Sequence, residues 1–173
     1  MKKIILTIIL TIAAANAHSQ VAIGKASVTN TSVSLEFGSA DKGLLLPWVT
    51  SAASVSGAVD GTIIYDTSDK KVKYRKNNAW VDLSVDATGV VDTTLQDNLT
   101  ELATAKMAIG ANGATDTTPG ILVLTDTDKA MILPKVASPH LKIINPSSGM
   151  LAYDTTARQL AVYNGKVWSF WKP

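Results

Sequence analysis

The second half of this sequence restates the first half, and this repeat constrains the fold more than any other feature. Three blocks return in the same order at offsets of 86, 87 and 88 residues: VAIG at 21–24 as MAIG at 107–110, DKGLLLPWV at 41–49 as DKAMILPKV at 128–136, and GTIIYDT at 61–67 as GMLAYDT at 149–155. The drift in offset is so small that few insertions separate the copies, and chance does not place three such blocks in register. We therefore expect two diverged copies of one small module.

The closing block of each copy predicts a three-stranded antiparallel meander. In the first copy, residues 62–66, 71–75 and 79–83 are short runs rich in β-branched and aromatic residues, with turn-forming residues between them. The corresponding turn of the second copy is Asn164–Gly165, which suits a type I′ hairpin because both residues tolerate positive φ. The apolar runs LLLPWV and MILPKV each contain a proline, which cannot donate to a strand ladder, so we expect edge strands there.

A linker of different character joins the two copies. Its apolar positions recur at helical spacing: Leu95, Leu99, Leu102 and Lys106. This spacing predicts a helix of about three turns, and a lone helix so short must pack against something to be stable in water. The predicted fold class is thus mainly β: two duplicated small antiparallel β-meander modules, at residues 20–84 and 107–173, joined by a short helical linker at 85–106 after an N-terminal signal peptide.

The N-terminus has the three parts of a cleavable signal peptide. Lys2 and Lys3 precede an apolar and threonine run at 4–15, and small residues follow it. The run is shorter than the roughly 20 residues that a membrane-spanning helix needs. Cleavage after Ala17 or after Ser19 fits the pattern, and we take residues 1–19 as the signal peptide. We expect an exported chain without a transmembrane segment in its mature form, located outside the cell or on its outer surface, with the periplasm as the alternative.

Composition narrows the partners of the mature chain. The sequence has no cysteine, so it has neither disulfides nor a thiol that could carry a lipid. Removing residues 1–19 removes two of the 16 basic residues and none of the 14 acidic ones, which leaves a net charge of zero. Domains that bind nucleic acid are typically strongly basic. We therefore expect no nucleic-acid partner.

No motif indicates catalysis. His140 is the one histidine certain to remain after cleavage, and its counterpart in the first copy is Ala53, so neither a histidine triad nor a zinc site is expected. The aspartates recur beside Thr, Ser or Lys, contexts that favour turn and cap roles. We expect a non-enzyme with no catalytic, cofactor-binding or metal-binding residues, and no cofactor.

Two groups of residues are candidates for ligand binding. Lys71, Lys73 and Arg75 alternate with apolar residues, so one face of a strand carries three cations that could meet an anionic surface polysaccharide. Alternatively, charged side chains on an exposed strand discourage edge-to-edge aggregation. Trp48 and Trp171 have no tryptophan counterpart in the other copy and could stack on sugars or dock a protein. Burial in the core or in a subunit interface is the alternative for both.

The ordered blocks VAIG, DKGLLLPWVT and DGTIIYDTSDKKVKYRKNNAWVDL resemble a group of secreted bacterial cell-surface repeat proteins. Modules of that group contain VGIGT-like, KGFLLPRVT-like and GLIIYNT…VYNGTSW-like segments, and the first segment is similar to that in phage tail-fibre shaft proteins. The resemblance implies an exported, β-rich and often fibrous or oligomeric protein. In this sequence Trp48 and Lys135 stand where arginine usually follows the proline.

Together these patterns predict a non-enzymatic exported structural or adhesive protein of the bacterial cell surface or extracellular matrix. A carbohydrate-binding module is the alternative, and a secreted polysaccharide-degrading enzyme is a second alternative. Each module has only about 65 residues, a size at which one chain buries little of its surface, so we expect a homo-oligomer joined in part through residues 95–107. The likeness to fibre shafts favours a trimer, while the linker stripe could instead fold back on its own meander.

Overall fold

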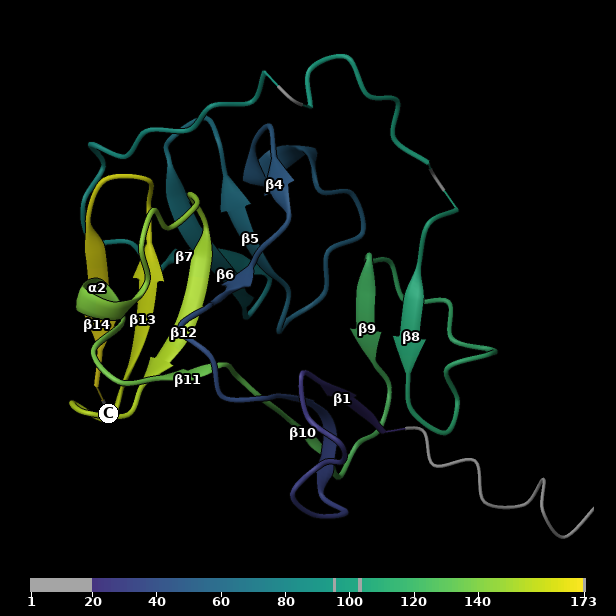
Figure 1. Cartoon of the computed structure of the whole chain (residues 1–173). Helices are drawn as coiled ribbons and strands as arrows, with labels where there is room; N and C mark the ends of the chain where they lie inside the picture. The colour runs from purple at the N-terminus through teal and green to yellow at the C-terminus, as the bar shows by residue number, and fades with distance from the viewer. Residues whose placement is uncertain (1–19, 95, 103, 173) are drawn as a thin grey trace, which may run out of the picture.

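The computed structural model describes residues 20–94, 96–102 and 104–172, so the predicted signal peptide lies outside the described residues. The chain is mainly β, as expected, with one α-helix and one 3-10 helix in the described part (Figure 1). The elements of the first half are β1 (Val21–Ile23), β2 (Val33–Phe37), β3 (Leu44–Leu45), β4 (Trp48–Val49), η1 (Ala52–Ser54), β5 (Ile63–Asp66), β6 (Lys71–Lys76) and β7 (Ala79–Asp82). Those of the second half are β8 (Met107–Ile109), β9 (Leu122–Leu124), β10 (Ala130–Ile132), β11 (Lys135–Val136), α2 (Pro139–Lys142), β12 (Met150–Asp154), β13 (Gln159–Tyr163) and β14 (Trp168–Trp171).

Two sheets have the same strand arrangement. One has the order β4-β5-β6-β7 and the other β11-β12-β13-β14, and in both the first pair is parallel and the next two pairs are antiparallel. The registers agree at the offset of the sequence repeat: Ile64 pairs with Lys73 in the first sheet, and Ala152 pairs with Ala161 in the second. The two halves therefore pair their meander strands residue for residue in the same way.

The short strands before each meander form small parallel sheets. β1 pairs with β2, with Val21 opposite Leu35, and β8 pairs with β9, with Met107 opposite Leu122. These registers are again equivalent under the repeat. The β8-β9 pair lies apart from the two meanders, to their right in Figure 1.

The two halves exchange strands. β3, from the first half, pairs with β12 of the second half in an antiparallel manner, and β10, from the second half, pairs with β2 of the first half in a parallel manner. Each half thus completes a sheet of the other. The predicted module boundaries stay a prediction, but the halves are interlocked and are not separate bodies on a linker.

The main core lies between the two meanders. Tyr65 and Val72 of the first meander pack with Leu151 and Val162 of the second, and each of these four is 1 % exposed or less. Complete burial of one such side chain contributes roughly 1.5–3 kcal/mol relative to exposure. Packing between the halves is therefore the main source of their mutual attachment.

The predicted linker helix is wrong for the described residues. Residues 92–94, 96–102 and 104–106 form isolated turns, and Leu99 and Leu102 are exposed. At the predicted start, the Asp92 carboxylate accepts hydrogen bonds from the backbone N–H and the hydroxyl of Thr94. An aspartate in this position could equally cap a helix. The lack of a helix in the described part of the linker follows from its exposed leucines, whose packing would otherwise offset the cost of helix nucleation.

Candidate functional site

The seam between the two meanders is a closely packed contact between the halves. Tyr65 is fully buried there, and its hydroxyl donates a 2.9 Å hydrogen bond to the backbone oxygen of Asn164. Gly149 lies directly against this ring: a Cβ at position 149 would be 2.7 Å from the Tyr65 Cβ. Gly149 also has φ of +80°, which side chains disfavour. Close approach and backbone conformation therefore both require glycine at this point of the seam.

Trp48 belongs to the same seam. Its indole N–H donates a 2.7 Å hydrogen bond to the backbone oxygen of Ser148, and its ring lies 6.3 Å from that of Tyr65. The residue is half-buried and packs against the main core. The structure thus places Trp48 in the contact between halves, and sugar binding by it stays a prediction.

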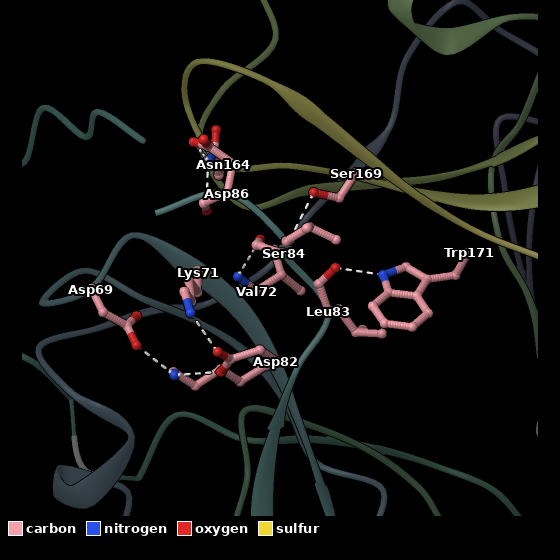
Figure 2. A network of polar contacts seen from close by, with 12 residues as sticks. Asp69, Lys71, Val72, Asp82, Leu83, Ser84, Asp86, Asn164, Ser169 and Trp171 are labelled. Carbon is pink, nitrogen blue, oxygen red and sulfur yellow. Dashed lines mark hydrogen bonds and ion pairs between the residues drawn. The ribbon is translucent and has the colours of Figure 1, made fainter. Parts of the chain in front are cut away.

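A polar network fastens the segment after β7 to the second meander (Figure 2). The side-chain amide of Asn164, fully buried, donates to the backbone oxygen and the carboxylate of Asp86, both at 3.1 Å. The backbone N–H of Val85 donates to the Ser169 hydroxyl at 3.0 Å, and the indole N–H of Trp171 donates to the Leu83 backbone oxygen. The predicted ligand-binding residue Trp171 is therefore held by its N–H, while 42 % of its surface remains exposed.

The three predicted cations of β6 have partners within the chain. Lys71 pairs with Asp82 at 2.6 Å, and Lys73 bridges Asp69 and Asp82 at 2.5 and 2.7 Å. Burial favours the neutral form of Lys73, but hydrogen bonds to these two carboxylates outweigh it and raise its pKa. Arg75 lies over the ring of Trp80, 5.7 Å from its centre. Binding of an anionic ligand by this strand stays a prediction, and such a ligand would have to compete with the carboxylates.

Two equivalent buried carboxylates organise the loops that follow β4 and β11. Asp66 accepts a 2.7 Å hydrogen bond from the Ala52 backbone N–H, and Asp154 accepts a 3.1 Å bond from that of Ser138. Burial opposes the ionisation of both, but their hydrogen bonds outweigh it and lower the pKa of each carboxyl. Their roles are structural, in line with the turn contexts of the sequence.

Glu36 was not singled out by sequence reasoning. It is 3 % exposed on β2 and accepts 2.6 Å bonds from the Lys25 ammonium and the Thr29 backbone N–H. These bonds, led by that from Lys25 and followed by that from the Thr29 hydroxyl, lower the Glu36 pKa to about 2. The signal that could have indicated it is a charged residue inside an otherwise apolar and serine-containing strand, VSLEF.

Other chemistry is not assembled in the described part of the chain. Within residues 20–94, 96–102 and 104–172, no three His, Asp or Glu side chains are grouped so that they could hold a metal ion. His140 lies edge-on against Phe170, 5.7 Å between ring centres. Across those same residues no helix is both long and apolar enough to cross a membrane.

A comparison with protein families identifies the family of this chain. A model described as the phage tail like trimerisation region matches residues 22–98 and 110–172, which together include most of the chain and parts of both halves. The chain belongs to this family. Membership in this family of phage tail-like trimerisation regions indicates a structural, fibre-like protein and supports a homo-oligomer. No match was found among curated proteins or among solved structures.

Proposed function

We propose that this protein is an exported, non-enzymatic structural or adhesive component of the bacterial cell surface or extracellular matrix, and that it acts as a homotrimer. The observation that carries this proposal is the match of both halves to a trimerisation region. The signal-peptide pattern of residues 1–19 supports export, and the resemblance to secreted repeat proteins supports a surface role.

Under this proposal the two halves are copies of one ancestral module. The support is twofold: the sequence blocks recur at nearly constant offsets, and the strand registers are equivalent in every meander pair. A short module that cannot bury its apolar face alone needs a neighbour. Duplication supplies one neighbour within the chain, and oligomerisation supplies the next.

The test is the mass and the location of the mature chain. Multi-angle light scattering of residues 20–173 is expected to give three times the mass of one chain, and fractionation of the native bacterium is expected to find the protein in the medium or at the outer surface. A single-chain mass at micromolar concentration contradicts the trimer. Recovery of full-length chain from the cytoplasm contradicts export.

One observation favours carbohydrate binding as a second function. Trp171 on β14 is 42 % exposed, and its ring is held in place by the hydrogen bond from its indole N–H to the Leu83 backbone oxygen. Exposed aromatic side chains held in a fixed orientation can stack on sugars. On a glycan array, specific binding by the parent should be lost in Trp171→Ala and kept in Leu141→Ala, which removes an apolar side chain that is 72 % exposed elsewhere. Equal signals for all three proteins remove this candidate.

A further inference from the structure

β3 and β10 are equivalent strands of the repeat, yet each has a partner that the other lacks. β3 pairs with β12 at Met150 and Leu151, where it continues the edge that β11 occupies further along. β10 instead pairs with β2. Because the rest of the pairing is equivalent in the two halves, the difference marks two positions where a strand is missing.

The sequence repeat locates the two positions where a strand is missing. The counterparts of Met150 and Leu151 are Thr62 and Ile63, and among the described residues no strand pairs with that part of the β5 edge. The counterpart of β2 is β9, which within the described chain pairs only with β8. The missing pairs are therefore β10 with β5 and β3 with β9.

Both missing pairs join the second half to the first half. Neither pair forms within the described chain, but both can form at once between two chains, on the edges of β3 and β10 that their present partners leave open. We propose that the second half of one copy docks on the first half of the next copy, in the way the first half docks on the second within the chain. Its β10 then pairs with β5 of the neighbour, and its β9 pairs with β3 of the neighbour. This inference rests on the proposed trimer and specifies its interface.

Side-chain burial matches this arrangement. Within the chain, Tyr65 lies against Gly149, which is buried. The equivalent residues on the free surfaces are Tyr153, which is half-buried, and Gly61, which is exposed. A Cβ at Gly61 would meet nothing within 4 Å, although this glycine also has positive φ. The ring of Tyr153 from one copy fits the open space above Gly61 of the next.

Apolar side chains on the two meanders also differ in burial between equivalent positions. In the chain, the Tyr65 and Val72 row packs on the Leu151 and Val162 row, and all four are buried. Their counterparts lie further along the same faces of the two sheets and are only half-buried: Ile63 and Tyr74 in the first half, Tyr153 and Leu160 in the second. Ile63 and Leu160 also contact the edge of the core within the chain. Joining these two rows between copies removes apolar surface from water, which favours association.

Charge complementarity supports the same contact. Trp48 donates to the backbone of Ser148 within the chain, and the counterparts of these two residues are Lys135 and Asp60. Both are exposed in the single chain, and the Asp60 carboxylate also accepts hydrogen bonds from the backbone N–H groups of Asn77 and Asn78. Between copies they come together with opposite charge, which accounts for a lysine at the position where the first half has tryptophan. The contact is specific to the boundary between chains.

Such an interface is head-to-tail, since it uses different surfaces on the two partners. Repetition of a head-to-tail contact either closes into a ring or continues as a filament. The match to a trimerisation region favours closure after three copies, so that six halves surround one axis and no strand edge of this kind remains free. Leu45 and Leu122, 47 % and 41 % exposed in the single chain, lie on the two strands that would pair.

The test uses the fact that the chain has no cysteine. Opposed residues of an antiparallel pair have Cβ atoms about 4.5–5.5 Å apart, close enough for a disulfide after small adjustments. Thr62→Cys with Ile132→Cys places one thiol on each side of the proposed interface. The matched control is Leu45→Cys with Met150→Cys, the equivalent pair within the chain. After mild oxidation, a non-reducing gel should give covalent dimers and trimers for the first pair and single chains with altered mobility for the control.

The outcomes separate the interface from the trimer. Trimer mass by light scattering with intermolecular disulfides in the first pair supports the inference. Trimer mass without them, when the control pair does cross-link, overturns the interface and leaves the trimer standing. A single-chain mass for the parent overturns both.

A charge exchange gives a second measurement that does not depend on disulfide formation. Lys135→Asp is expected to weaken the trimer at least tenfold in its dissociation constant, because two like charges then face each other, and Asp60→Lys in the same chain should restore most of the affinity. Equal affinity for the parent and the single variant overturns the inference. So does a double variant that is as weak as the single one while Asp60→Lys alone, which also loses the bonds from Asn77 and Asn78, melts like the parent.

Discussion

The two halves of this chain pair their meander strands in the same way, but equivalent residues differ in how deeply they are buried. Tyr65 is fully buried and its counterpart Tyr153 is half-buried; Gly149 is buried and its counterpart Gly61 is exposed. Local strand pairing therefore follows from the repeated sequence, whereas burial depends on which neighbour each half has. Where equivalent residues differ in burial, the more exposed one marks a surface that has no partner within the described chain.

The largest expected difference between equivalent positions is at the tyrosines. Tyr65→Ala should lower the free energy of unfolding by about 3–5 kcal/mol, as truncation of a buried aromatic residue does. Tyr153→Ala should cost about 1–2 kcal/mol in dilute protein because half of its environment is missing there. Urea denaturation at low concentration measures both. Equal losses of stability would contradict the difference in burial between the two tyrosines. A loss for Tyr153→Ala that grows with protein concentration would show that a second chain covers Tyr153.

The glycines should differ next. Gly149→Ala forces a Cβ against the Tyr65 ring and strains the backbone, so we expect a loss of about 2–4 kcal/mol. Gly61→Ala adds only backbone strain in the single chain, about 1–2 kcal/mol. Melting temperatures of the two variants, recorded by circular dichroism in dilute protein, give the comparison. A Gly61 variant as unstable as the Gly149 variant would show that the space above Gly61 is already filled.

The paired tryptophans of the meanders should differ less. Trp168 packs against the buried cluster of Val136, Ile143 and Ala152, while Trp80 contacts Arg75 at the surface of its sheet. We expect Trp168→Ala to cost about 2–3 kcal/mol and Trp80→Ala about 1 kcal/mol. Guanidinium titration with matched slopes measures the difference. Identical midpoints would contradict the difference in packing between Trp80 and Trp168.

The smallest expected effect concerns acid. Glu36 has a pKa lowered to about 2 in the folded chain, against roughly 4.3 when unfolded, and its counterpart in the second half is Val123. A lowered folded-state pKa contributes stability that is present above the unfolded pKa and is lost as pH falls from about 4 to about 2. Amide exchange at β1 and β2 should therefore accelerate across this range more than at β8 and β9. Glu36→Gln should abolish that pH dependence, and a variant with the parent profile would contradict the assignment.

Much of the architecture is readable from the repeat, and specific residues show where that ends. The alternation in KVKYRK places β6 where the structure has it, because side-chain period is a local property. The expected type I′ turn at Asn164–Gly165 is wrong, since Gly165 has a φ of +97° but Asn164 does not have positive φ. The turn with two positive φ angles is instead in the first meander, at Asn77 (+52°) and Asn78 (+60°). The exchange of β3 and β10 was not foreseen, since a short apolar strand carries no local information about which distant edge it joins. The linker helix was wrong in its described part because leucine spacing indicates an apolar face but does not say whether a partner covers it, and Leu99 and Leu102 stay exposed.

The candidate site shows the same division. The turn roles of Asp66 and Asp154 follow from their neighbours in sequence, while the partners of Lys71 and Lys73 depend on tertiary register and could not be read from the strand alone. The contact between the halves at Tyr65 depends on Gly149, which is nearly half the chain away in sequence. The only sequence signal for this contact is that both copies have a glycine at the equivalent position, Gly61 and Gly149. Long-range contacts of this kind are invisible to pattern reasoning within a short window.

The exchange of strands between halves has a kinetic consequence. β2 pairs with β10 through Val33 and Ala130, so the sheet closes only after a loop of about a hundred residues has been ordered, and such topologies fold slowly. The interlocked strands must also separate together before either half can open. We therefore expect slow unfolding, so the lifetime of the folded chain would be set by that rate more than by its equilibrium stability.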